Sequence, residues 1–172
     1  MDDIVKAALK KWPNVPHCYG WLALDARGDW YMRDERIQAA GPFPRVKGSR
    51  IAHEKLLAFI HRNYAADERG AWFFQNGPQR VYVELEAAPW VWRVEGDGRV
   101  ASHTGLPAVP RAAWLDEHWR LFLDTDLGFG LVHTLDMGAA AEQVEQGRWQ
   151  PAEAAFAAMP QRFGYVLQPR KE

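Results

Sequence analysis

The chain has 172 residues, of which 48% are hydrophobic and 25% charged, so it can bury a core and is too apolar to be disordered throughout. Its 21 basic and 22 acidic residues give a formal charge of −1, which provides no basic field for nucleic acid. No stretch reaches the roughly 18 to 20 apolar residues of a membrane span, and no export signal opens the chain. With a single cysteine, these features predict a soluble cytoplasmic protein with no nucleic-acid or membrane partner.

The N-terminal part of the chain is predicted to combine helices with a hairpin. Residues 1–12 predict a helix that Asp2 or Asp3 caps, because apolar residues recur along one side and lysines occupy the last turn. A hairpin follows, with strands at 19–25 and 29–33. A second helix is predicted from Ser49 to about residue 64, where the apolar residues lie near helical spacing: Ile51, Leu56, Phe59, Ile60 and Tyr64.

The rest of the chain is predicted to be mostly strands separated by turns. The strands are expected at 70–76, 80–86, 90–95, 99–104, 112–115, 119–125, 130–135 and 163–168, with one short helix at 139–146. Glu84 and Glu86 alternate with apolar residues in one strand, so both carboxylates are expected on its solvated face. The alternative is an acid/base pair, since strand geometry separates the two by about 6.5–7 Å.

One turn motif recurs in the chain. Asp25-Ala-Arg-Gly-Asp-Trp30 and Asp67-Glu-Arg-Gly-Ala-Trp72 both read D-x-R-G-x-W, and Asp116-Glu-His-Trp119 resembles a shortened third copy. Glycine allows a positive φ, Asp can cap the backbone, and Trp can anchor the following strand in the core. The alternative is that turn residues recur by chance.

These elements predict an α+β fold of repeated antiparallel β-meander or hairpin units with a few packed helices. Residues 1–104 are expected to form a β-rich unit with the N-terminal helix and the long helix 49–64. Residues 105–172 are expected to form a smaller β-rich unit with a short helix, and the two units are expected to share one compact core.

The order of motifs between Gly20 and about Leu135 resembles an uncharacterised bacterial family of domains of unknown function. The counterparts of the family's motifs are Gly28-Asp-Trp30, the helix with Ile51 to Ile60, Leu85-Glu-Ala-Ala-Pro-Trp90, and Thr125-Asp-Leu-Gly128. The resemblance implies a compact α+β fold and a suggested role in ligand binding or signalling. Ala87 replaces the family's acidic residue and Trp90 its Phe, which puts any site that needs this acid in doubt.

Nucleophilic catalysis by the only thiol is one hypothesis for function. Cys18 follows His17, but adjacent residues of an extended segment point to opposite sides, so Cys18 needs another, converging imidazole such as His53, His103 or His133. A buried structural cysteine is the alternative. The six histidines form no H-x-H or H-x-x-x-H pair, and Gly128-Phe-Gly130 lacks the rest of a phosphate-binding loop, so neither a metal nor a cofactor is predicted.

Aromatic and cationic side chains provide a second hypothesis. Trp90 and Trp92 share a strand face, and four arginines lie in this and neighbouring hairpins: Arg33, Arg36, Arg80 and Arg93. Tryptophan walls and arginine clamps can hold an anionic or planar small molecule or a partner's peptide. The alternative is that the tryptophans fill the core under the arginine stems.

The sequence therefore favours a ligand-binding or protein-binding regulatory module with a role in signalling, which is a monomer or a weak homodimer. A hydrolase-like enzyme using Cys18 is the alternative. A third hypothesis is a scaffold that docks a protein partner through an exposed tryptophan such as Trp12 or Trp149. Neither the ligand nor the partner can be identified from the residues.

Overall fold

The computed structural model describes residues 1–172. Five helices and two sheets, of six and seven strands, make up an α+β fold in which most strand pairs are antiparallel, which confirms the predicted fold class. The chain forms two compact units. Unit 1 contains residues 1–25, 29–86 and 165–172, and unit 2 contains residues 26–28 and 87–164, so the boundary that the sequence suggested at 104/105 falls inside unit 2.

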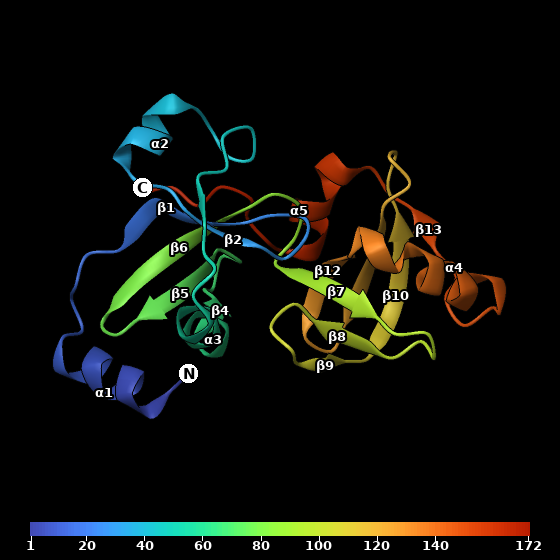
Figure 1. Ribbon diagram of the computed structural model, residues 1–172, viewed down its shortest axis with the longest axis horizontal. Coiled ribbons are helices and arrows are strands. Elements are labelled where there is room, and N and C mark those ends of the chain that lie inside the picture. Colours follow the sequence, from blue (N-terminus) through green and yellow to red (C-terminus); the bar gives the residue numbers. More distant parts are fainter. The chain divides into compact units, whose positions relative to one another are not determined.

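Unit 1 contains the six-stranded sheet, in the order β3-β2-β1-β6-β5-β4 (Figure 1). Its central strands β1 and β6 run parallel, and the other pairs are antiparallel. Helix α3 packs against β5, with Phe59 and Phe74 edge to face. The elements are α1 (Asp3–Lys11), β1 (Cys18–Leu24), β2 (Trp30–Met32), α2 (Glu35–Ala40), β3 (Ser49–Arg50), α3 (Glu54–Arg62), β4 (Tyr64–Ala66), β5 (Trp72–Asn76) and β6 (Gln79–Leu85).

The predicted helix 49–64 is shorter in the structure and begins with His53 as its N-cap. Ser49 belongs to β3, and the N–H of Ile51 donates to Trp30 O, so backbone pairing with β2 outcompetes the helix at this end. At the other end, Tyr64 pairs with Phe74 in the sheet. The apolar spacing correctly located the helical face, but local periodicity cannot reveal sheet pairing across the chain.

The side chains of Glu84 and Glu86 are partly buried and form ion pairs, so the prediction of a solvated strand face is wrong. Lys47 Nζ lies 3.3 Å from Glu86 and 3.0 Å from Asp25, and an Arg33 nitrogen lies 3.7 Å from Glu84. Lys47 comes from the loop that follows α2, and alternation within one strand cannot predict a contact with this distant loop.

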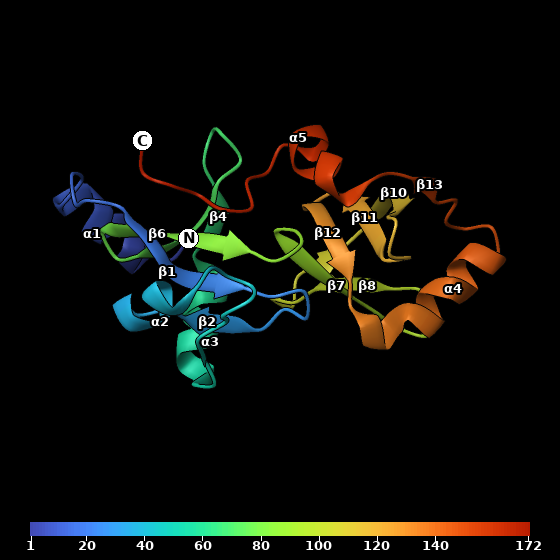
Figure 2. The same ribbon diagram turned by 90° about the horizontal axis from the view of Figure 1, so that it is seen from above.

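Unit 2 contains the seven-stranded sheet, in the order β13-β10-β11-β12-β7-β8-β9 (Figure 2). Its largest fully buried side chains come from three strands and the C-terminal helix: Trp92, Phe122, Leu123, Leu131 and Met159. The elements are β7 (Trp90–Val94), β8 (Val100–Ser102), β9 (Pro107–Ala108), β10 (Pro110–Leu115), β11 (Leu121–Thr125), β12 (Gly128–Val132), α4 (Met137–Glu145), β13 (Ala152–Glu153) and α5 (Met159–Phe163).

The strand predicted at 163–168 is absent. Phe163 ends α5, Gly164 takes a left-handed conformation with φ 70°, and the chain then returns to unit 1 without forming a strand. The backbone still bonds to the first sheet, because Leu85 N–H donates to Leu167 O and Val166 N–H donates to Gly70 O.

Five hairpin turns share one backbone pattern. In each, the N–H of the first residue donates to the C=O of the fifth, and the fourth residue has a positive φ. Glycine is the fourth residue in four of these turns, because it adopts this conformation without a Cβ clash. The turns span residues 25–29, 67–71, 95–99, 102–106 and 116–120.

The turn at Asp116 has the same length as the two D-x-R-G-x-W turns, although its sequence, Asp116-Glu-His-Trp-Arg120, keeps only the Asp of that motif. Asp116 accepts hydrogen bonds from the N–H groups of His118 and Arg120, as Asp67 does from Arg69 and Ala71. Trp119 occupies the glycine position, with φ 62°, and is 73% exposed rather than anchored in the core. An L residue in this conformation costs about 1–2 kcal/mol.

No helix of the structure is both long enough and apolar enough to span a membrane.

Candidate functional site

The three catalytic candidates from the sequence lie in different surroundings. His17 is exposed and packs edge to face against Tyr82, with ring centroids 5.7 Å apart. The Nδ1 of His53 accepts a hydrogen bond from the N–H of Leu56 and so caps α3. Cys18 lies at the start of β1, partly buried and with a free thiol.

The thiol of Cys18 faces an apolar groove of unit 1. The groove contains no histidine or acid and is lined by Cys18, Trp21, Leu22, Met32, Ile51, Leu56, Ile60, Phe74, Asn76 and Val81. Burial raises the pKa of the Cys18 thiol, which leaves it protonated near neutral pH. A thiol activated for attack needs a neighbouring base or a lowered pKa, and these surroundings supply neither.

Arg33 is a buried arginine that holds the loop after α2. Its side chain is 3% exposed, and its guanidinium donates to Gly41 O at 2.7 Å and Val46 O at 3.2 Å. These two bonds join the guanidinium to two carbonyl groups of the loop, and its other terminal nitrogen lies 3.7 Å from Glu84. The surroundings of Arg33 are therefore those of a structural clamp.

Arg36 and Arg80, the other two candidates in unit 1, differ in their contacts. Arg36 is exposed on α2. The guanidinium of Arg80 stacks over Phe73 at 3.9 Å and donates to the hydroxyl of Tyr82, which in turn donates to Asp67 at 2.8 Å. Arg80 thus covers an aromatic surface at the edge of β5 and β6.

Trp90, Trp92 and Arg93 belong to β7 in unit 2, so the six ligand-binding candidates do not form one cluster within a single unit. Trp90 and Trp92 are 6% and 0% exposed and stack on each other, and their N–H groups donate to Leu127 O and Leu123 O. Arg93 forms an ion pair with Asp136 at 2.6 Å. The six assignments stay predictions.

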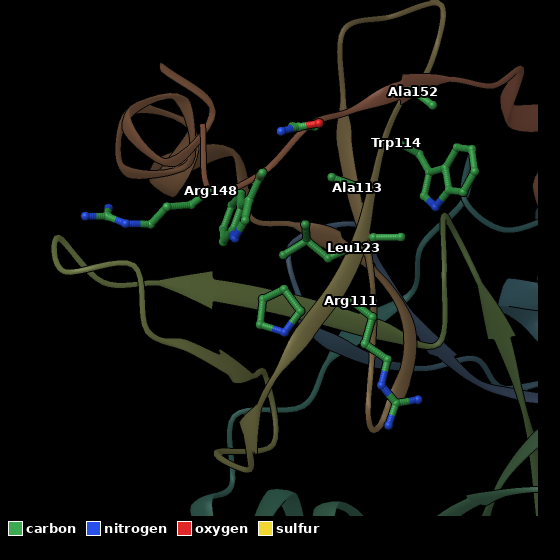
Figure 3. A pocket seen from close by; sticks show the side chains of 10 residues that line it. Arg111, Ala113, Trp114, Leu123, Arg148 and Ala152 are labelled. Carbon is green, nitrogen blue, oxygen red and sulfur yellow. The ribbon is translucent and has the colours of Figure 1, made fainter. Parts of the chain in front are cut away.

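Unit 2 contains another arrangement of tryptophans and arginines, around a cavity of about 320 Å³ (Figure 3). The cavity lies beside β10, where this strand is not yet paired with β13. The two strands pair only at Trp114 with Ala152 and at Leu115 with Glu153. Its lining comes from β10, from Leu123 of β11 and from the segment after α4: Pro110, Arg111, Ala112, Ala113, Trp114, Leu123, Arg148, Trp149, Gln150 and Ala152.

The charged lining residues of this cavity are both arginines. Figure 3 shows Arg111 and Arg148 at opposite ends, with their side chains extended outward. Arg148 donates to the amide oxygens of Gln143 and Gln146, and Arg111 is exposed without an ion pair. Because no carboxylate lines the cavity, its rim is positively charged and attracts anions.

The aromatic lining residues add a hydrogen-bond donor that is not used within the chain. Trp114 is packed by the guanidinium of Arg162 at 4.0 Å and by the ring of Phe163. Its indole N–H is buried and has no acceptor. A buried unsatisfied donor costs about 1–3 kcal/mol, so an acceptor that reaches this group gains that energy.

Few of the residues that line this cavity can be singled out from the sequence. Trp149 was singled out as a surface residue for partner docking, whereas Arg111, Trp114 and Arg148 were not singled out. The adjacent Arg148 and Trp149, directly after the predicted helix 139–146, were a usable signal. Their neighbour across the cavity, β10, is more than 30 residues away in sequence, and only the β10–β13 pairing brings the two segments together.

No group of three or more His, Cys, Asp or Glu side chains is placed to hold a metal ion.

The comparisons with known proteins identify a family but no activity. The DUF2944 family model, which carries the description "Protein of unknown function (DUF2946)", matches residues 1–170. The chain belongs to this family. The resemblance to an uncharacterised family of domains of unknown function is thus confirmed. No curated protein matches this DUF2944 family member.

Two solved structures resemble the fold of this DUF2944 family member. A DUF1285 family protein from Silicibacter pomeroyi DSS-3 has a TM-score of 0.52 at 14% identity, covering 83% of this chain and 84% of that one. A DUF1285 family protein from Shewanella baltica OS155 has a TM-score of 0.48 at 14% identity, covering 72% of this chain and 91% of that one. At this identity, the first likeness shows a shared fold alone.

Proposed function

We propose that this DUF2944 family member is a ligand-binding module whose site is the cavity beside β10, and that the ligand is a planar anionic small molecule. The observation that carries the proposal is a cavity whose charged lining residues are both arginines and whose wall includes the half-buried Trp149. The buried, unsatisfied N–H of Trp114 lies next to this cavity and becomes accessible to a ligand when the neighbouring side chains move. The cavity's volume, about 320 Å³, lies within the range of small-molecule sites.

Each part of the lining has a role in this proposal. The half-buried indole of Trp149 provides a flat apolar surface, and Trp114 provides a donor for an acidic oxygen. Arg111 and Arg148 draw the anion to the rim, where each exposed charge contributes up to about 1 kcal/mol. The cytoplasmic location and the regulatory role predicted from the sequence remain part of the proposal.

A titration with 1-naphthoate, a planar carboxylate, tests this function. In a ¹H–¹⁵N spectrum of the full chain, the indole N–H signal of Trp114, assigned by its loss in W114F, is expected to shift on binding. Neutral 1-naphthalenemethanol is the matched probe without the charge and is expected to bind more weakly.

Three arginine variants test which positive charges contribute to the binding of 1-naphthoate. R111Q and R148Q are each expected to weaken binding of 1-naphthoate up to about fivefold, which corresponds to the loss of one rim charge. R45Q removes an exposed arginine of unit 1 and is expected to leave binding unchanged. An unmoved Trp114 signal, or equal binding of the neutral probe, contradicts the proposal.

The hydrolase alternative is not favoured by any contact of Cys18, because the groove that it lines contains no imidazole.

A further inference from the structure

Trp119 has the most exposed large apolar side chain of unit 2, at 73%. Its φ of 62° belongs to the position where the four equivalent turns carry glycine. The ring gains little from burial, and the backbone conformation is one that L residues rarely adopt. Neither burial of the ring nor the preference of the backbone explains a tryptophan at this position.

The Trp119 ring borders a second cavity of unit 2, of about 450 Å³, between the β10–β11 turn and the end of β13. Its lining also comes from the segment just after β13, which approaches the turn because Ala154 N–H donates to Leu115 O. The lining residues are Leu115, Asp116, Glu117, Trp119, Glu153, Ala154 and Ala155.

The electrostatics of this Trp119 cavity are opposite to those of the cavity beside β10. Asp116 is neutralised by Arg120, at 2.7 Å. Glu117 accepts a hydrogen bond from Phe156 N–H, which lowers the pKa of its carboxyl group, so Glu117 is ionised at neutral pH. Glu153 is exposed and has no cationic partner, and no Lys or Arg lines the cavity. Two carboxylates therefore flank an exposed tryptophan ring.

The turn that presents the ring is held rigidly. Asp116 accepts from the N–H groups of His118 and Arg120, and the Arg120 guanidinium stacks over Phe156 at 4.6 Å. A pre-positioned backbone loses little entropy when the ring is contacted, which favours binding.

We propose that the Trp119 cavity docks a basic segment of a partner protein, with an arginine or lysine side chain lying over the Trp119 ring between Glu117 and Glu153. Cations bind to the face of tryptophan more favourably than to other rings, and a guanidinium can stack flat on it while donating to carboxylates. The positive charge of the occupant matches the two carboxylates that lack a lysine or arginine partner.

A fluorescein-labelled tetra-arginine peptide is the probe for this surface. Its binding to the full chain is followed by fluorescence anisotropy at 150 mM salt, where exposed charges farther apart than about 8 Å are largely screened. W119G is expected to weaken binding at least tenfold, and E117Q/E153Q is expected to weaken it several-fold. The thermal midpoint of W119G is expected to equal or exceed that of the wild type, because glycine suits this backbone position.

Matched controls separate this docking from general attraction to acidic protein. W12A removes another half-exposed tryptophan, and E142Q/E145Q removes two exposed carboxylates from α4. Both are expected to bind the peptide like the wild type. Equal binding by W119G, or equal losses in E142Q/E145Q and E117Q/E153Q, overturns the proposal. Binding of 1-naphthoate is expected to be unchanged in W119G, so the two sites can fail independently.

Discussion

Gly130 of β12 is the position where adding one methyl group is expected to damage unit 2 most. Its backbone is extended, so the effect comes from space rather than from φ. A Cβ at this position would lie 2.4 Å from Nε1 of Trp92 and 2.7 Å from Cβ of Trp90. Trp92 is fully buried, and its N–H donates to Leu123 O at 3.1 Å. G130A therefore forces a core indole to move.

The expected loss of stability follows from two terms. Overpacking a well-filled core costs about 1–3 kcal/mol, and a buried N–H without its acceptor costs about 1–3 kcal/mol. G130A is thus expected to lower the free energy of unfolding by about 2–5 kcal/mol. Urea denaturation followed by tryptophan fluorescence measures this change, and the Trp92 indole N–H is expected to lose protection from hydrogen exchange.

G138A is the matched control, since a Cβ at Gly138 in α4 would meet no atom within 4 Å apart from its chain neighbours and the backbone of its own helix. Alanine favours a helix over glycine, so G138A is expected to leave stability unchanged or raise it by up to about 1 kcal/mol. A G130A protein within about 0.5 kcal/mol of the wild type would refute the argument that the Trp92 ring is confined by the missing Cβ of Gly130.

Three further perturbations test other parts of the structure. Desolvation raises the pKa of Asp116, but its hydrogen bonds and the charge of Arg120 outweigh this effect and lower the pKa in the folded state. The stability that the ionised Asp116 contributes is therefore present above about pH 4 and is lost as the pH falls below it. In D116N, the denaturant midpoint is expected to depend less on pH between about 2 and 4. Burial raises the pKa of Cys18, so iodoacetamide is expected to alkylate it more slowly at pH 8 than free cysteine, and a faster reaction would contradict the described surroundings. R33Q removes the clamp on the loop after α2 and is expected to cost about 2–3 kcal/mol and to speed tryptic cleavage at Arg45, whereas unchanged cleavage would show that the loop holds without it.

Much of the fold could be predicted, because the alternation of apolar and polar residues and the residues of turns are signals that lie within a short segment of the chain. The strands around Val83 and Trp92 were located correctly, and so was the helical face that buries Ile60. The errors lie where distant segments compete: sheet pairing holds Ser49 outside α3, and Lys47 reaches over from a loop to Glu86. The spacing of residues within one strand or helix does not report such contacts with distant segments.

The sequence predicts the residue types of the candidate site, tryptophan and arginine, but not which tryptophans line it. An arrangement of tryptophan and arginine was expected, yet the two tryptophans chosen, Trp90 and Trp92, share a strand face that turns into the core. Trp114 and Trp149 line a cavity because β10 and β13 separate after a short stretch of pairing. Strand separation depends on the whole sheet, so residue type alone could not distinguish the two pairs.

The path of the chain between its units has a thermodynamic consequence. The chain leaves unit 1 after Glu86 and returns at Tyr165, and the hydrogen bond from Leu85 N–H to Leu167 O keeps exit and return side by side. If unit 2 melts while unit 1 stays folded, residues 87–164 become a closed loop. Closing a loop becomes only about 0.6 kcal/mol harder with each doubling of its length. Unit 1 can therefore stay folded when unit 2 melts. A ligand that binds unit 2 is expected to raise the thermal midpoint of unit 2 and to leave the midpoint of unit 1 unchanged.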